Sequence, residues 1–371
     1  MSIPNKTIMF ILLAVSVVFI SVGAVSAADS THKVANVKSN THISTTTDET
    51  IQEMIDHAKP GSTISIVKGT YNENLIITKN ITLKGAGASN TIINGRHKGS
   101  VITIKRKQTV KLIGLTLING KATDGGGIRN VGGTLIVENS IIKGNTANYG
   151  GGIDNTNYGT CTVINSLITN NTAEYDGGGI NSGKLTILNS KINGNTAHIG
   201  GGIYHSAGIN SKVINSIIEH NSAFAAGGIC NQGSLTVKNS KITLNTARGN
   251  NGGGIYNSGT LNIENSTITR NTAEHHGGGI FTEGGTCTLT WSTIEHNSAY
   301  RGGGIYNTNK HIEHLINGVL SLHNSIITLN TAKNDGGGIF NNGIGEKDGK
   351  TQIKENHPDN VEGNTIKINI S

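Results

Sequence analysis

The sequence predicts an all-β fold, a parallel β-helix of about 10–12 coils, because one short motif recurs at a nearly fixed interval. Gly-Gly-Gly-Ile, or a near copy of it, recurs mostly 23 to 27 residues apart. Each unit also contains Asn-Ser and then Asn-Thr-Ala or Asn-Ser-Ala, and its apolar residues alternate with polar ones. A period of this length indicates stacked units rather than one compact core. The repeat isoleucines are Ile128, Ile153, Ile180, Ile203, Ile229, Ile255, Ile280, Ile305 and Ile339.

The regular coil is clearest in residues 252–276. The glycines at 252–254 predict a bend, and the residues 255–257, Ile-Tyr-Asn, predict a short strand. In the next strand Leu261 and Ile263 are expected to point inward, where they would stack on their copies in neighbouring coils. Two further short strands separated by Asn turns complete a coil, and the stacked Leu, Ile and Val side chains form the core.

Asparagine recurs at one turn of each coil, where it tolerates left-handed backbone geometry. Stacked at coil spacing, these side chains are predicted to form an amide ladder in which each satisfies its neighbour. Trp291 takes this position in one coil and is expected to bulge outward. The members of the predicted structural Asn ladder are Asn139, Asn165, Asn189, Asn215, Asn239, Asn265 and Asn324.

The N-terminal region has a different organisation. Residues 1–27 read as a signal peptide, with an apolar run that ends in small residues, and residues 28–46 as a flexible leader. A short helix is predicted from Thr50 to Ala58, because Thr50 and Glu53 have the spacing of a capping box. This helix would cover the open end of the first coil. The predicted divisions that follow are 47–120 for the cap and early coils, 121–340 for regular repeats, and 341–371 for a C-terminal closing segment.

Composition limits the classes of function. Of the net charge of +7, +6 arises in residues 29–120, which carry 12 Lys and Arg against 6 Asp and Glu, and Lys6 supplies the rest. An exported chain without a binding motif is not expected to bind nucleic acid. The three cysteines are predicted to be unpaired, with Cys161 and Cys287 inward and too many coils apart for a disulfide. Cys230 lies on a different strand of its coil.

Candidate chemistry is sparse in the sequence. Asp124, Asp176 and Asp335 precede glycine runs but are expected to lie coils apart, and Asp154 with Arg129 one coil below is expected to form a salt bridge. His275-His276, and His311 with His314 in an insertion at 310–318, offer metal-ligand atoms without a fixed third ligand. The sequence therefore predicts no catalytic residue, no metal and no cofactor.

The outward position after each repeat isoleucine becomes aromatic along the chain. Stacked rings at coil spacing predict either a self-stacking ladder that stiffens this face or a ridge that binds sugar faces or a partner protein. The possible surface-binding ridge consists of Tyr204, Tyr256, Phe281, Tyr306 and Phe340.

The repeats resemble those of known surface proteins. Residues 252–257, then Asn265-Ser266 and 271–273, are similar to the repeats of polymorphic outer membrane proteins and, more closely, of adhesin-like surface proteins of methanogenic archaea. The stretches 50–120 and 356–361 resemble the beginning and end of such arrays. This resemblance implies a right-handed β-helix of the pectate-lyase type at the cell surface, but these 371 residues are not expected to include the autotransporter barrel of the large family members.

These observations predict an exported, non-catalytic, adhesin-like protein of the cell surface or envelope. Its expected partner is a polysaccharide or a surface protein of the envelope or of a host, and no membrane span is expected after signal cleavage. Two alternatives stay open. One is a polysaccharide-active enzyme, a lyase or glycoside hydrolase, which needs carboxylates that converge from neighbouring coils. The other is a purely structural envelope component, which would need to self-associate.

Overall fold

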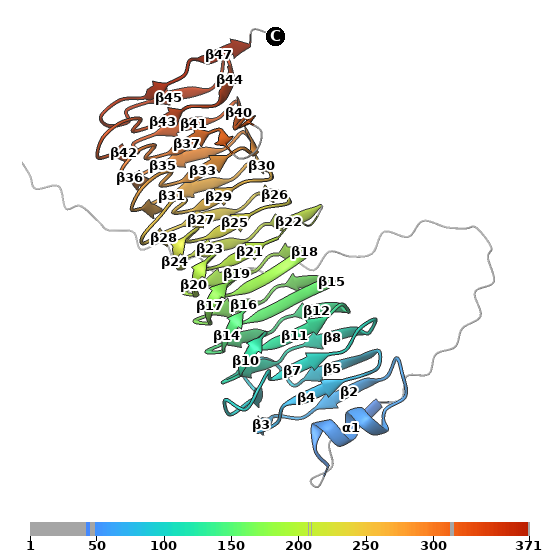
Figure 1. Ribbon diagram of the computed structural model, residues 1–371. Coiled ribbons are helices and arrows are strands. Elements are labelled where there is room, and N and C mark those ends of the chain that lie inside the picture. The colour runs from blue at the N-terminus through green and yellow to red at the C-terminus, as the bar shows by residue number, and fades with distance from the viewer. Residues whose placement is uncertain (1–41, 45–48, 207, 209, 312–314, 370–371) are drawn as a thin grey trace, which may run out of the picture. The chain divides into compact units, whose positions relative to one another are not determined.

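The computed structural model describes residues 42–44, 49–206, 208, 210–311 and 315–369, which belong to one compact unit. This unit is a right-handed parallel β-helix of about 11 turns, as the repeat predicted. Figure 1 shows the coils stacked along one axis from helix α1 (Ile51–His57) to strand β47 (Ile366–Asn369). No helix in the described ranges is long and apolar enough to cross a membrane. The signal peptide and most of the leader predicted for 1–46 lie outside the described residues.

Each coil contains up to four short strands, which pair in parallel with their counterparts in the coils on either side. The coil at 255–273 shows the pattern with β29 (Ile255–Asn257), β30 (Thr260–Glu264), β31 (Thr267–Thr269) and β32 (Thr272–Ala273). Rows of first and second strands belong to one 24-stranded sheet, third strands to a 12-stranded sheet, and fourth strands to a 9-stranded sheet.

First and second strands alternate along the chain. The first strands are β4 (Leu75–Ile77), β7 (Ile102–Ile104), β11 (Ile128–Val131), β21 (Ile203–His205), β25 (Ile229–Asn231), β29, β33 (Ile280–Glu283), β37 (Ile305–Thr308), β43 (Ile339–Asn341) and β46 (Val361–Gly363). The second strands are β1 (His42–Ser44), β2 (Thr63–Ile66), β5 (Ile81–Gly85), β8 (Thr109–Ile113), β12 (Thr134–Glu138), β22 (Ser211–Ile214), β26 (Ser234–Lys238), β30, β34 (Thr286–Thr290), β40 (Val319–His323), β44 (Ile344–Asp348) and β47. In two coils the first and second strands are continuous and form one long strand, β15 (Ile153–Ile164) in one coil and β18 (Ile180–Leu188) in the next.

Third and fourth strands complete the coils. The third strands are β3 (Gly69–Tyr71), β6 (Thr91–Asn94), β9 (Thr116–Ile118), β13 (Ile141–Lys143), β16 (Leu167–Thr169), β19 (Lys191–Asn193), β23 (Ile217–Glu219), β27 (Lys241–Thr243), β31, β35 (Thr293–Glu295), β41 (Ile326–Thr328) and β45 (Gln352–Lys354). The fourth strands are β10 (Lys121–Asp124), β14 (Thr146–Tyr149), β17 (Thr172–Asp176), β20 (Thr196–Ile199), β24 (Ser222–Ala225), β28 (Thr246–Ala247), β32, β36 (Ser298–Ala299) and β42 (Thr331–Ala332).

The core is a set of aliphatic stacks that run through the coils. The repeat isoleucines are in register, with Ile255 paired to Ile229 on one side and Ile280 on the other, and each is fully buried. Leu261 and Ile263 of the second strand are also buried, as predicted. Complete burial of one such side chain contributes about 1.5–3 kcal/mol. Stability therefore accumulates coil by coil along the axis.

Helix α1 closes the N-terminal end in the way its capping box predicted. The side chain of Thr50 accepts a hydrogen bond from the Glu53 backbone at 3.2 Å, and the Glu53 carboxylate accepts one from the Thr50 backbone at 2.8 Å. Ile51, Met54 and Ile55 are completely buried in the same cluster as the first inward strands. The apolar layer of the first coil is thereby removed from water.

The predicted Asn ladder forms in part, and a second ladder lies inside the turns. Each predicted ladder asparagine has a positive φ, and hydrogen bonds of 2.9–3.2 Å link Asn189, Asn215, Asn239 and Asn265 in succession. Trp291 replaces asparagine with φ +47° and is 62% exposed, as expected. The asparagine of Asn-Thr-Ala or Asn-Ser-Ala forms the inner, buried ladder, which Asn356 extends at a half-buried position. The buried members are Asn145, Asn171, Asn195, Asn221, Asn245, Asn271, Asn297 and Asn330.

The chain beyond the regular repeats continues the same geometry. Residues 341–371 include β44, β45, β46 and β47, which pair with strands of the preceding coils. The insertion at 310–318 contains a short antiparallel hairpin of β38 (Lys310–His311) and β39 (Leu315–Ile316), and its tip lies outside the described residues. All three cysteines are unpaired and buried, as predicted.

Candidate functional site

The candidate site lies where the glycine run joins the fourth strand of one coil to the first strand of the next. Two rows of side chains flank this bend, one from the residue before the glycines and one from the residue after the repeat isoleucine. Gly177 has φ +68°, and a Cβ there would lie 2.5 Å from the Ile180 carbonyl oxygen and 2.8 Å from the Asn181 nitrogen. Only glycine permits this approach, which brings the two rows together.

Three carboxylates from successive coils share this face. Asp124 pairs in register with Tyr149, and Tyr149 pairs with Asp176, so Asp124 and Asp176 occupy equivalent positions two rungs apart. At strand spacing their Cα atoms are about 9–10 Å apart. Asp154, from the second row, belongs to the coil between them. Asp124 and Asp176 therefore lie coils apart and not on adjacent rungs, as expected, and Asp154 comes from the coil between them.

The polar contacts of these residues distinguish their roles. The Arg129 guanidinium forms a salt bridge with Asp124 of its own coil at 2.9 Å, and both side chains are partly exposed. Asp154 is only 1% exposed and accepts a hydrogen bond from the Asn181 amide at 2.8 Å. Asp154 is thus held inside the face, whereas Asp124 and Arg129 are open to a ligand.

Asp176 has the electrostatic character of an acid. Burial raises the pKa of its carboxyl group, an effect that His198 partly offsets. Burial, assisted by Cys230 and by Asp176, also raises the pKa of Tyr204 to about 12. The Tyr204 hydroxyl donates to the Gln232 side chain at 3.0 Å. Because a half-buried carboxyl prefers its neutral form, Asp176 keeps its proton to higher pH than an exposed aspartate.

The aromatic row is a stacked ladder on the C-terminal half of the same face. Ring centroids are 5.1 Å apart for Tyr256 and Phe281, 5.4 Å for Phe281 and Tyr306, and 4.9 Å for Tyr306 and Phe340. Phe281 and Tyr306 are buried, whereas Tyr256 and Phe340 are half-buried. Tyr204 is separated from the ladder, because the buried thiol of Cys230 stands between it and Tyr256.

Two side chains from the row before the glycines cover part of this ladder. The His276 ring stacks on Tyr306 with centroids 4.5 Å apart, and burial lowers the pKa of His276. The Arg301 guanidinium lies 5.6 Å from the Phe340 ring centroid and pairs with Asp335 at 3.1 Å. Asp335 therefore takes part in an ion pair far along the row from Asp124. Among the described residues, no three His, Cys, Asp or Glu side chains come close enough together to hold a metal ion.

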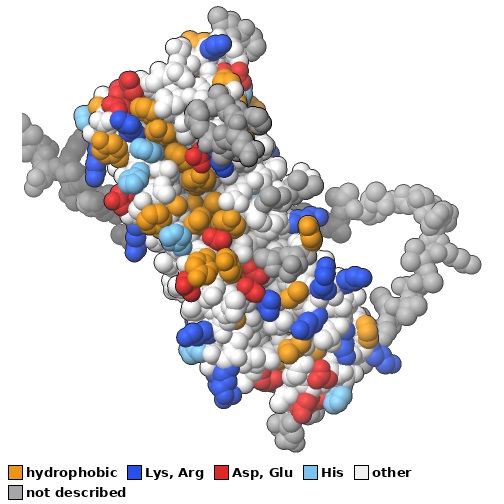
Figure 2. All heavy atoms as spheres, in the orientation of Figure 1, with side chains coloured by type: hydrophobic (Ala, Val, Ile, Leu, Met, Phe, Trp, Pro, Cys, Tyr) orange, Lys and Arg blue, Asp and Glu red, His pale blue; other side chains and the backbone are white. Residues whose placement is uncertain are grey.

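Exposed rings on the fourth strands extend the face sideways. The Tyr149 and Tyr175 rings lie 5.3 Å apart, and the His198 and Phe224 rings stack at 4.9 Å. Figure 2 shows hydrophobic and histidine side chains gathered on the part of this surface between β24 and β42. Sequence reasoning missed these pairs because the two positions after Asn-Thr-Ala or Asn-Ser-Ala vary between coils, and only stacking of adjacent coils brings the rings together.

Comparisons with known proteins identify the fold. No family model and no curated protein matches the sequence. The A-module of the mannuronan C-5 epimerase AlgE4 of Azotobacter vinelandii is similar in structure, with a TM-score of 0.54, 14% identity, and 86% of this chain and 92% of that chain covered. The catalytic domain of a GH87 alpha-1,3-glucanase has a TM-score of 0.52 and 14% identity, with coverage of 85% of this chain and 64% of that chain. The pectate lyase Pel9A has a TM-score of 0.45 and 15% identity over 77% of this chain and 72% of that chain.

These likenesses correct one expectation and confirm another. The solved structures of similar fold are polysaccharide-modifying enzymes, which contradicts the expectation that this chain is not an enzyme. At 14% identity the likeness shows the fold alone. That fold is the pectate-lyase-like right-handed parallel β-helix that the repeats predicted.

Proposed function

We propose that this protein is a glycoside hydrolase that cleaves a polysaccharide lying along the glycine-bend face. The observation that supports this most is the pair of Asp124 and Asp176, two rungs apart in one row. Inverting glycosidases place their two carboxyl groups about 6.5–9.5 Å apart, which leaves room for a water molecule. Side chains whose Cα atoms are about 9–10 Å apart reach this separation without backbone movement.

The two carboxyl groups differ in the way such a reaction requires. Asp176 is the proposed general acid, because burial raises its pKa and keeps a proton available for the leaving oxygen. Asp124 is the proposed base, since its salt bridge with Arg129 holds an ionised carboxylate that can activate water. Asp154 and Asn181 are proposed positioning residues, because their hydrogen bond lies in the row beside both.

The remainder of the face supplies binding surface. The exposed Tyr149 and Tyr175 rings come from positions next to Asp176, Tyr149 as its partner in register and Tyr175 as its neighbour in the chain, so they can contact the apolar faces of sugar rings. Tyr204, Tyr256 and Phe340 of the aromatic row are half-buried, so their exposed edges can contact a longer chain. Phe281 and Tyr306 would instead hold the ladder rigid, because they are the buried members of the stack.

The place of action is proposed from the N-terminal segment. We infer that residues 1–27 direct export and that the substrate is a polysaccharide of the cell envelope or its surroundings. The apolar run, its small-residue end and the resemblance of the repeats to surface proteins support this assignment.

The test is hydrolysis of a polysaccharide panel by the purified protein. We expect release of reducing ends from at least one neutral or acidic polysaccharide, with an inverted anomer in the first product detected by NMR. Asp176→Asn and Asp124→Asn should each lower the rate about 100-fold or more. Asp335→Asn is the matched control, because Asp335 occupies the same row and pairs with Arg301 but lies far from Asp176.

Three results would contradict the proposal. If no polysaccharide of the panel releases reducing ends, the proposed activity is wrong. If Asp176→Asn keeps full activity, Asp176 is not the general acid. Products with unsaturated ends would show a lyase reaction instead. The pH profile provides a further check, because activity should fall as rising pH removes the proton of Asp176, at a higher pH than for an exposed aspartate.

A further inference from the structure

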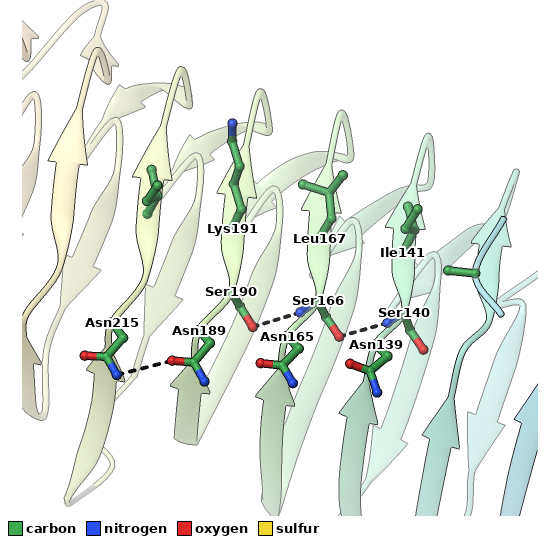
Figure 3. A pocket seen from close by; sticks show the side chains of 12 residues that line it. Asn139, Ser140, Ile141, Asn165, Ser166, Leu167, Asn189, Ser190, Lys191 and Asn215 are labelled. Carbon is green, nitrogen blue, oxygen red and sulfur yellow. Dashed lines mark hydrogen bonds between the residues drawn. The ribbon is translucent and has the colours of Figure 1, made fainter. Parts of the chain in front are cut away.

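A second surface feature lies at a different turn of the same coils. A groove of about 540 Å³ follows the Asn-Ser turn between the second and third strands (Figure 3). Its rim carries the exposed amides of the predicted ladder, and Ile141, Leu167 and Ile217 from the third strands lie alongside. The groove crosses several coils, so an occupant must be an extended chain that follows the axis.

The amide ladder is open where the groove lies. The Asn215 amide donates to Asn189 at 3.2 Å, and equivalent bonds continue from Asn215 toward the C-terminal coils. In the two coils on the N-terminal side of Asn189, the ladder is not bonded. The Asn139 amide forms only a long contact of 3.5 Å with Glu138, and the Asn165 side chain has no hydrogen-bond partner among the described residues. Donors and acceptors of these side chains are therefore available to a ligand at each coil.

The backbone of the groove is already satisfied. The Asn139 nitrogen donates to the Ile164 carbonyl at 3.1 Å, the Asn165 nitrogen to Leu188 at 3.0 Å, and the Leu167 nitrogen to Ser140 at 2.9 Å. A peptide that adds as a strand needs unpaired backbone groups at an edge, and these coils offer none here. Recognition has to rest on side-chain amides and apolar contacts.

The groove also favours an uncharged ligand. Among its lining residues Lys191 alone is charged, and its ammonium group forms a salt bridge with Glu219 at 2.6 Å. Amides beside aliphatic side chains match the chemistry of a sugar chain, whose hydroxyl groups donate and accept while its ring faces are apolar. We propose that this groove binds one neutral polysaccharide chain along the β-helix axis, with Asn139, Asn165 and Asn189 bonding its hydroxyl groups.

This binding site is independent of the proposed hydrolysis, because it occupies a different turn of the coil. Cellohexaose, maltohexaose and mannohexaose serve as neutral probes in saturation-transfer NMR with the full chain, and hexagalacturonate serves as the acidic probe. We expect saturable binding of at least one neutral hexasaccharide. Asn165→Gly removes the amide without strain, since the position has φ +47°, and should weaken binding about five- to tenfold.

The controls separate the groove from the rest of the protein. Asn265→Gly removes an amide of the same ladder outside the groove and should leave the affinity unchanged. Leu167→Ala should weaken binding through its apolar contact, whereas Asp176→Asn should lower the rate of hydrolysis but leave this binding unchanged. Three results would overturn the proposal: no saturable binding of any neutral probe, equal effects of Asn165→Gly and Asn265→Gly, or tighter binding of hexagalacturonate than of every neutral probe.

Discussion

The Asn195 side-chain oxygen accepts two hydrogen bonds from Asn171 of the adjacent coil, one from its backbone nitrogen and one from its amide, both 3.0 Å long. Asn195 in turn donates twice to Asn221, at 2.9 and 3.0 Å. These side chains are at most 1% exposed. The inner ladder thus satisfies buried turn groups that water cannot reach.

Asn221→Ala should destabilise the protein strongly. The change leaves the Asn195 backbone nitrogen without its acceptor and takes one of two acceptors from the Asn195 amide, which keeps the Ile168 carbonyl. It also removes the donor to the Ile192 carbonyl. We expect a loss of about 2–4 kcal/mol in the free energy of unfolding, measured by urea denaturation. Asn265→Gly, in the exposed ladder, should cost less than about 1 kcal/mol. Similar losses of unfolding free energy in both variants would show that the inner ladder stabilises the protein no more than the exposed ladder does.

Trp291→Asn should stabilise the protein. Trp291 has φ +47°, a region that costs a side chain with a large Cβ substituent more than it costs asparagine. The new amide could donate to Asn265, as Asn265 donates to Asn239. We expect a gain of about 0.5–1 kcal/mol in urea denaturation. Trp291→Ala has no such gain, so equal stability of the two variants would contradict this explanation.

His205→Asn should reduce the loss of unfolding free energy that occurs as the pH falls below neutral. His205 is completely buried, with its ring nitrogens 2.7 Å from Asn231 Oδ1 and 3.1 Å from the Gly183 carbonyl oxygen, and burial lowers its pKa. The unfolded chain therefore binds the proton more tightly, so stability falls as pH drops below the unfolded value of about 6.5 and levels off below the folded pKa.

The measurement is the difference in unfolding free energy between pH 7 and pH 5. It should shrink in His205→Asn and shrink further when His276, whose pKa is also lowered, is replaced as well. His97→Asn is the control at an exposed position with φ +58°, which asparagine accepts. An unchanged difference in His205→Asn would exclude a contribution of this ring.

The thiols should be inert in the native protein. Burial raises the pKa of Cys161, Cys230 and Cys287 to about 12 in each case. Because only the thiolate attacks disulfide reagents, we expect no reaction with Ellman's reagent at pH 8 and three thiols per chain in urea. Stoichiometric labelling of any one thiol in the folded state would contradict the buried positions.

Prediction from sequence succeeded where a residue's role depends on its place in the repeat. The capping box of Thr50 and Glu53, the inward isoleucines and the outward Trp291 follow from local spacing and chain geometry. It also placed Asp124 and Asp176 at equivalent positions coils apart, but it did not show that burial raises the pKa of Asp176 or that Arg129 pairs with Asp124, because neither follows from spacing along the chain. The buried state of Phe281 and Tyr306 was equally hidden, since His276 of another segment covers the ladder.

The repeat period and the alternation of apolar residues were sufficient to specify the β-helix, because every coil makes the same contacts with its neighbours. Local spacing also specified the cap and the unpaired cysteines. Only the tertiary structure decided which amides of the Asn ladder bond each other and which carboxyl group is half-buried. Those properties depend on the relative height and tilt of neighbouring coils and on the loss of solvent, neither of which is encoded in the spacing of residues within one coil.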